Sequence, residues 1–271
     1  MGVKLVFAKR LVLFVTPLVT GSAIATSSSL AATLASSDAR LNINNFSHSP
    51  TDIFAATDSQ AYATAPSGQV TSLADASAGF VVYPGNPSTY ALTSTSSTAS
   101  GNGNNYLGQA QSLAVIIGYN FIVGKGETFS FDLDGFLNLA TSIDAPQYER
   151  ANASGNIFLA LYDSTNGSLV DSFTIDGNLT TPNSGDSLVS QASENFLISV
   201  AKNYSFGGTQ ESTSAFINGR FSRSFDSLTY LNLVEFKASQ AIVKTPEASN
   251  TLALLCLCFI GIGYRFSSSR R

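Results

Sequence analysis

The chain has 271 residues, of which 44% are hydrophobic and only 12% are charged, and its net charge is −4. From Arg40 to Lys244, sixteen Asp and Glu stand against eight Lys and Arg, so this part alone carries a net charge of −8. An acidic surface of this kind argues against binding to nucleic acid or to an anionic membrane. A body of about 200 residues can build one hydrophobic core, so a single domain is expected here.

The first 25 residues predict a secretory signal peptide. Positive side chains precede an apolar run at residues 11–19. Ala23 and Ala25 then supply the small-x-small pattern of a signal peptidase site, and we expect cleavage after Ala25. Two alternatives stay open, which are cleavage as late as Ala32 and a helix that remains in the membrane as an anchor.

Residues 26–110 are rich in Ser, Thr, Asn and Gly and contain few large apolar clusters. Residues 94–105 read STSSTASGNGNN and hold no core-forming side chain, so their composition predicts a low-complexity loop. Residues 79–83 read GFVVY before a proline-rich turn, which predicts a strand. We therefore expect this part to be the start of the exported domain, with few strands.

Residues 111–244 carry most of the strand signals. Apolar, β-branched and aromatic residues recur in short runs here, and no stretch shows helical periodicity with caps. Asn166 and Gly167 separate two such runs and predict a β-hairpin. Many short strands with turns between them predict an all-β fold, an antiparallel β-sandwich or a jelly-roll-like domain. The expected strands cover residues 112–123, 127–133, 157–162, 168–175, 195–206, 214–225 and 228–238.

The tail, residues 245–271, consists of a turn, an apolar run and a basic end. Pro246 disfavours a helix that enters from upstream. Residues 249–264 are almost wholly apolar and predict a short transmembrane helix, with a buried core helix as the alternative. Both cysteines of the chain lie inside this run, so the exported body is expected to fold without disulfides. A basic flank, expected on the cytoplasmic side, follows at Arg265, Arg270 and Arg271.

This tail resembles the PEP-CTERM sorting domain. Its motif reads Pro246, Glu247, Ala248, an apolar stretch follows, and the chain ends in arginine. The family has proline at the third motif position, where this chain has Ala248. The resemblance implies sorting and processing by an exosortase-like enzyme, with the tail anchored in the inner membrane before it is cleaved. It covers only residues 245–271 and does not extend to the body.

The body offers few residues for catalysis. His48 is the only histidine, so a Ser-His-Asp triad would need it as the base, and no G-x-S-x-G sequence accompanies it. We therefore interpret His48 as a solvated loop residue. The sequence also contains no set of His and Cys ligands for zinc and no glycine-rich phosphate loop. These observations predict a protein that is not an enzyme.

Four carboxylates near predicted turns are candidates for a structural calcium site, namely Asp132, Asp134, Asp163 and Asp171. Calcium prefers six to eight oxygen ligands. Asp and Asn also stabilise turns by bonding to their own backbone, so the turns explain these residues equally well. No other cofactor is expected.

Together these features predict an exported protein of the cell envelope, cell surface or extracellular matrix, with a structural or adhesive β-sandwich. Its expected partners are signal peptidase, an exosortase-like enzyme, the membrane through the tail, and extracellular polysaccharide. A carbohydrate-binding module is the first alternative, with Tyr119, Tyr148 and Tyr204 as groove residues, although the chain has no tryptophan for stacking. The second alternative is a secreted hydrolase that uses a pair of carboxylates across a cleft.

Overall fold

The computed structural model describes residues 32–83 and 89–245, which form twelve β-strands in one compact unit. Within these two ranges, no helix is long and apolar enough to span a membrane. The helices predicted for residues 1–25 and 249–264 lie outside the described residues. The strands are β1 (Ala32–Asn44), β2 (Asp52–Thr64), β3 (Ser67–Val81), β4 (Tyr90–Asn104), β5 (Leu107–Val123), β6 (Thr128–Ser142), β7 (Arg150–Asp163), β8 (Leu169–Thr181), β9 (Ser187–Ala192), β10 (Phe196–Ser205), β11 (Gln210–Ser224) and β12 (Thr229–Lys244).

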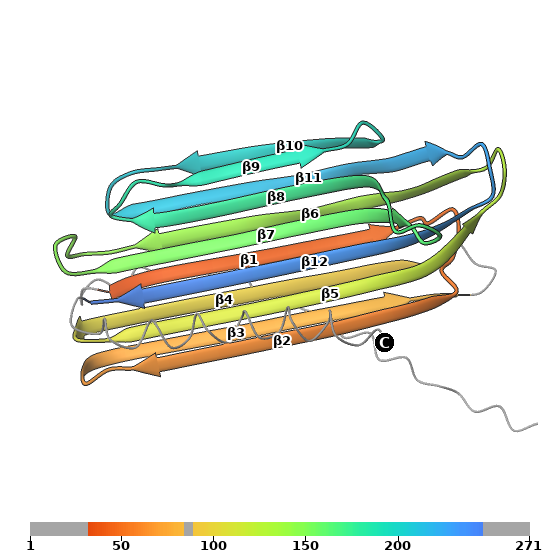
Figure 1. Cartoon of the computed structure of the whole chain (residues 1–271). Coiled ribbons are helices and arrows are strands. Elements are labelled where there is room, and N and C mark those ends of the chain that lie inside the picture. The colour runs from red at the N-terminus through yellow and green to blue at the C-terminus, as the bar shows by residue number, and fades with distance from the viewer. Residues whose placement is uncertain (1–31, 84–88, 246–271) are drawn as a thin grey trace, which may run out of the picture. The chain divides into compact units, whose positions relative to one another are not determined.

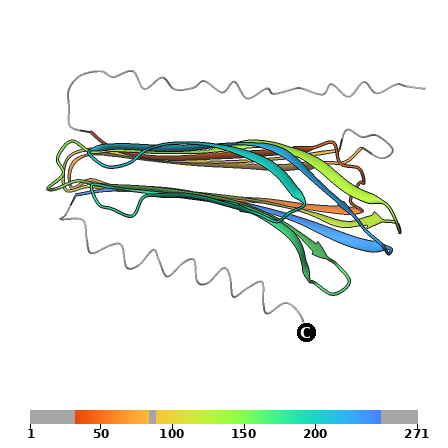
Figure 2. The ribbon, with the colours of Figure 1, turned by 90° about the horizontal axis from the view of Figure 1, so that it is seen from above.

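The strands form two antiparallel sheets of six, so the predicted β-sandwich is confirmed. Sheet A has the order β10-β11-β6-β1-β4-β3, and sheet B has the order β2-β5-β12-β7-β8-β9. In Figure 1 the strands lie in face-to-face pairs, with β1 against β12 and β4 against β5. Figure 2 shows the same two sheets edge-on as separate layers. Each strand therefore has one face toward the other sheet and one face toward the outside.

Alternation of side chains builds the interior from both sheets. In β1, every second residue from Ala35 to Ile43 is buried, Ser37 included, while the residues between them are partly exposed. This is the period of two that a strand with one core face requires. The hairpin predicted at residues 166–167 is also confirmed, because β7 and β8 pair antiparallel on either side of it.

Phenylalanines fill one end of the sandwich. Their ring centroids lie between 4.8 and 6.5 Å apart, within the range of favourable aromatic contacts. Rings from both sheets meet at this end, because Phe121 of β5 lies 5.0 Å from Phe129 of β6. We call this cluster the aromatic core, and it consists of Phe46, Phe80, Phe121, Phe129, Phe131, Phe173, Phe196 and Phe221.

The remainder of the interior combines buried leucines, such as Leu137, Leu139 and Leu179, with small and hydroxyl-bearing side chains. The Thr95 hydroxyl lies 2.8 Å from that of Ser239, and the Ser97 hydroxyl lies 2.8 Å from that of Ser112, so these pairs join the two sheets. Nearby, the buried ring of Tyr106 packs directly on a glycine of β4. A Cβ atom on Gly101 would lie 2.2 Å from Tyr106 Cε2, so only glycine leaves room for the ring.

The prediction of a loop at residues 94–105 is wrong, because nearly all of these residues belong to β4. β4 pairs with β1 on one side and with β3 on the other, which satisfies its backbone hydrogen-bonding groups. Its inward hydroxyls bond to the facing sheet in place of apolar contacts. The expectation of few strands in residues 26–110 is wrong for the same reason, since β1 to β4 all lie there.

Candidate functional site

The four calcium candidates are divided between the two sheets. Asp132 and Asp134 lie on β6 of sheet A, and each already accepts a hydrogen bond from a β1-side asparagine. The amide of Asn45 lies 2.7 Å from Asp132 Oδ2, and that of Asn42 lies 3.0 Å from Asp134 Oδ1. Arg220 Nε also lies 3.6 Å from Asp132 Oδ1. Neutral and cationic donors thus surround this pair.

Asp163 and Asp171 belong to the β7–β8 region of sheet B. Asp163 Oδ1 accepts the backbone N–H of Thr165 at 2.8 Å, which is turn chemistry. Asp171 is buried and accepts a hydrogen bond from Arg223 at 2.8 Å. The four aspartates therefore do not converge on one site. Among the residues that the structure describes, no three His, Cys, Asp or Glu side chains are grouped so that they could hold a metal ion.

His48 is not a free solvated side chain, contrary to our interpretation of the sequence. Its Nδ1 lies 2.8 Å from the Ser47 hydroxyl, and its Nε2 lies 3.1 Å from Glu127 Oε2. A hydrogen bond from the Gly124 N–H, followed by the contact with His48, lowers the pKa of the Glu127 carboxyl. Because its pKa is lower in the folded state, the Glu127 carboxyl stabilises the fold at pH values above its unfolded-state pKa. This stabilisation is lost as the pH falls through the folded-state pKa.

The Ser47 hydroxyl in this arrangement is hydrogen-bonded to the backbone of β6 and is not a free nucleophile. It accepts the backbone N–H of Ser130 at 2.8 Å and lies 3.2 Å from the carbonyl oxygen of Thr128. Both partners belong to β6, so Ser47 ties the β1–β2 connection to that strand. The order Ser-His-Glu alone does not make an acyl-transfer site, which also requires donors for an oxyanion.

A buried ion pair lies between the sheets and escaped the sequence reasoning. Glu235 and Lys237 point inward from β12 with 0% exposure, and both contact the hydroxyl of Thr93 on β4. Burial lowers the pKa of Lys237, because the charged amine loses its water. Among the residues that the structure describes, Glu235 Oε2 has no hydrogen-bond partner. Side chains two residues apart on a strand point to the same face, so Glu235 and Lys237 share the inward face of Leu233. This alternation in the sequence could have revealed the pair.

The outer face of sheet B carries a straight row of amide and hydroxyl side chains, one from each strand. The pairing registers align them directly across the sheet. We call this set the amide row, and it consists of Gln60, Gln111, Gln240, Ser154, Asn178 and Ser187. Such a row presents both donors and acceptors without net charge.

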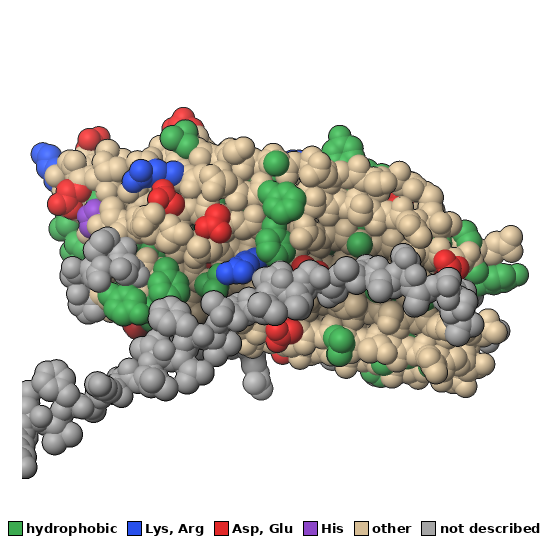
Figure 3. Space-filling model, turned by 180° about the vertical axis from the view of Figure 1, so that it is seen from behind, with side chains coloured by type: hydrophobic (Ala, Val, Ile, Leu, Met, Phe, Trp, Pro, Cys, Tyr) green, Lys and Arg blue, Asp and Glu red, His purple; other side chains and the backbone are tan. Residues whose placement is uncertain are grey.

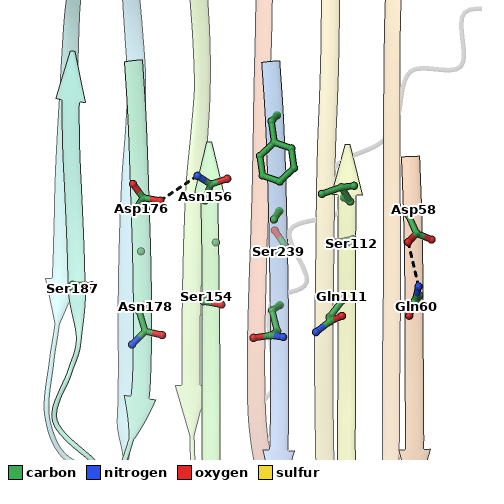
Figure 4. Close-up of a pocket in the computed structure, with 16 residues that line it drawn as sticks. Asp58, Gln60, Gln111, Ser112, Ser154, Asn156, Asp176, Asn178, Ser187 and Ser239 are labelled. Atoms are coloured by element: carbon green, nitrogen blue, oxygen red, sulfur yellow. Dashed lines mark hydrogen bonds between the residues drawn. The ribbon is translucent and has the colours of Figure 1, made fainter. Parts of the chain in front are cut away.

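A second row lies beside the amide row and completes a hollow of about 580 Å³ on this face. In it, Asp58 accepts from Gln60 at 3.2 Å and Asp176 accepts from Asn156 at 3.1 Å, as Figure 4 shows. Phe236 and Leu113 add apolar surface to the lining. The hollow therefore combines an apolar patch with a row of polar groups, and apolar and polar groups together line many small-molecule and glycan sites.

The two carboxylates of the hollow stand far apart. In the registers, Asp58 and Asp176 are separated by β5, β12 and β7, which is four strand spacings. At about 4.8 Å per spacing the separation is about 19 Å, well beyond the 5 to 10 Å at which paired carboxyls hydrolyse a glycosidic bond. These two residues therefore do not form the carboxylate pair that the hydrolase alternative needs.

The tyrosines proposed for a sugar groove do not meet. Tyr119 lies on β5 of sheet B, whereas Tyr204 lies on β10 of sheet A and stacks on Phe206 at 5.1 Å. Tyr148 lies in the β6–β7 connection. The amide row escaped prediction because it depends on the pairing of strands far apart in sequence. The sorting and cleavage residues of both termini, Ala23, Ala25, Pro246, Glu247, Ala248 and the three terminal arginines, lie outside the described residues.

No protein-family model, curated protein or solved structure matches this chain. The residues themselves are therefore the basis for any functional conclusion.

Proposed function

We propose that the chain is an exported protein of the cell surface or extracellular matrix, with a structural or adhesive β-sandwich. The predicted signal peptide and the PEP-CTERM-like tail support export and sorting by an exosortase-like enzyme. The acidic body supports solubility outside the cell. We also class the sandwich as jelly-roll-like, because seven of its eleven strand connections pass from one sheet to the other.

The observation that carries this proposal is the uncharged polar surface of both sheets. On β4 of sheet A the outward residues include Ser94, Ser96, Thr98 and Ser100, and sheet B carries the amide row. Figure 3 shows mostly uncharged polar side chains and backbone on one face, with only scattered charges. Broad surfaces of this kind suit contact with neutral, hydrated polymers, which offer hydroxyl groups rather than charge.

Cell fractionation tests the export part of the proposal. We expect the full chain to be recovered from the envelope or the medium, with a mass that shows removal of residues 1–25. The bulky substitution Ala25→Phe should block this cleavage, because the position before the cut requires a small residue. Ser27→Phe is the matched control and should leave the cleavage intact. Uncleaved parent protein in the cytoplasm would contradict the proposal.

The amide row favours a carbohydrate-binding module as the second candidate function. We expect the affinity for a neutral oligosaccharide to fall by a factor of about 2 to 12 for each amide removed. One neutral hydrogen bond contributes about 0.5 to 1.5 kcal/mol. The variants are Gln111→Ala and Gln240→Ala, measured by calorimetry against a panel of neutral glucans and other glycans. Thr98→Ala on sheet A is the control. Equal affinity in all three variants would exclude the hollow as the binding site.

A further inference from the structure

The sandwich ends in two pairs of edge strands on opposite sides. β2 and β3 form one side, and β9 and β10 form the other (Figure 1). Each of these strands is hydrogen-bonded to a single neighbour within its sheet. An edge strand of this kind leaves a line of backbone N–H and C=O groups on which another strand can pair.

The β2–β3 side lacks most of the devices that usually prevent such pairing. These strands are 13 and 15 residues long, neither contains lysine, arginine or proline, and their charged residues are Asp52, Asp58 and Asp75. Their registers with β5 and β4 run without a bulge. Natural edges are normally short, bulged or protected by lysine and proline, so a long regular edge indicates a pairing surface.

Apolar side chains are exposed on both sides. Leu73 of β3 is 65% exposed, and Leu197 of β10 is 71% exposed. The opposite side is also weakly protected, since Lys202 is the only lysine or arginine in β9 and β10. The partner of such a surface must supply a strand edge of little charge, and the opposite side of the same molecule does so. Its strands are shorter, since β10 has 10 residues and β9 has 6, so they would pair with part of β3 and β2.

The even number of strands in each sheet allows a second copy of this chain to pair with the exposed edges of the first. Each sheet has six strands and every pairing is antiparallel, so the two edge strands of a sheet run in opposite directions. A copy shifted sideways without rotation therefore brings its β10 antiparallel to β3 and its β9 antiparallel to β2. Both sheets continue in the same step, because β3 lies with β2 and β10 with β9.

We propose that the chain associates laterally with further copies of itself, through β3 and β2 of one copy and β10 and β9 of the next. The two surfaces differ, so the contact is heterologous and does not close, and the product is an open row of sandwiches. Six strands at about 4.8 Å give a repeat of about 29 Å. This lateral association extends the proposed structural role and rests on it for its place at the cell surface. The association itself is measured on purified protein, so its test does not depend on export.

The registers predict which residues meet. Asp75 of β3 lies in one cross-strand row with Asn203 of β10. Continuing that row into the next copy places the Asn203 amide opposite the Asp75 carboxylate, where it can donate a hydrogen bond. In sheet B the same construction places Val189 opposite Asp58.

Cysteine cross-linking of the full chain in mild detergent tests this register. In a Cys256→Ser, Cys258→Ser background, the pair Asp75→Cys and Asn203→Cys should give a ladder of disulfide-linked oligomers that a reductant dissolves. Asp75→Cys alone should give no ladder, because equivalent residues do not meet in a translated row. The matched control pairs Asn203→Cys with Thr98→Cys on β4 and should stay unlinked. Dimers from Asp75→Cys alone would show β3–β3 pairing and overturn the proposal.

Sedimentation velocity gives an independent measurement on unlinked protein. The parent chain should grow in size with concentration, and Leu73→Lys should reduce it to a single species, since lysine opposes edge pairing. Thr98→Lys, on an interior strand, should leave the growth unchanged. Association through the tail would be insensitive to Leu73→Lys. A parent that sediments as one monomer at every concentration overturns the lateral contact, whereas misplaced protein in the cell would overturn only the proposed function.

Discussion

Lys237→Met is expected to lower the free energy of unfolding by about 3 to 5 kcal/mol, because it leaves the Glu235 carboxylate buried without its cation. Glu235 is completely buried, and its Oε2 has no hydrogen-bond partner within residues 32–83 and 89–245. The Thr93 hydroxyl would then be the remaining partner of the carboxylate. Urea unfolding of the full chain in mild detergent, followed by circular dichroism, measures the loss.

The double variant Glu235→Leu, Lys237→Met separates the charge effect from a packing effect. Replacing a buried ion pair by apolar residues of similar size is neutral or stabilising by about 1 to 4 kcal/mol, so the double variant should regain at least the stability of the parent. A double variant as unstable as Lys237→Met would show that side-chain volume, rather than the unpaired charge, causes the loss.

Phe131→Ala is expected to cost about 3 to 5 kcal/mol, because it empties the centre of the aromatic core. The Phe131 ring lies 5.1 Å from that of Phe221 and 5.5 Å from that of Phe46, and the side chain is completely buried. Phe216→Ala is the matched control. Phe216 points outward from β11 and is 52% exposed, so its removal should change stability by less than about 0.5 kcal/mol.

Thermal and urea unfolding of these two variants measure the difference directly. Similar losses for Phe131→Ala and Phe216→Ala would contradict the placement of Phe131 inside the aromatic core and of Phe216 on the outer face of β11. A large loss for Phe216→Ala alone would place its ring in a contact with another molecule.

Apolar alternation predicted the second half of the fold well. The expected strands at residues 195–206 and 214–225 agree closely with β10 and β11, because phenylalanines and isoleucines mark their inward faces. The expected strand at 127–133 is only the start of β6, which continues to Ser142. Its later part holds as many large apolar residues, but Phe136 and Leu137 are adjacent, so the alternation is less regular there.

The first half could not be predicted by the same signal. In β4 the inward residues are Thr93, Thr95, Ser97 and Ala99, and serine and threonine also fill its outer face. Hydropathy does not distinguish two faces of equal polarity, so the strand looked like a loop. The short strand β9 was also missed, because a strand of 6 residues with only two large apolar side chains offers little pattern.

The candidate site was beyond sequence reasoning for a different reason. The amide row takes one residue from each of six strands, from Gln60 to Gln240. Nothing in the local sequence of any one strand marks these residues, since only the cross-strand registers bring them together. The carboxylates that the sequence did mark are engaged by neighbouring donors, as the Asp171 contact with Arg223 illustrates.

The contact between Gly101 and Tyr106 has a consequence for how β4 finds its place. A slip of one residue exchanges the two faces of a strand, and hydrophobicity normally forbids it. In β4 that safeguard is weak, because the exchange would trade one hydroxyl face for another. The Tyr106 ring supplies the missing discrimination, since a slip would bring the side chain of Ser100 or Asn102 to the position where even a Cβ atom collides with the ring. The contact between Gly101 and Tyr106 therefore fixes the register of β4, which the hydrophobicity of its two faces does not determine.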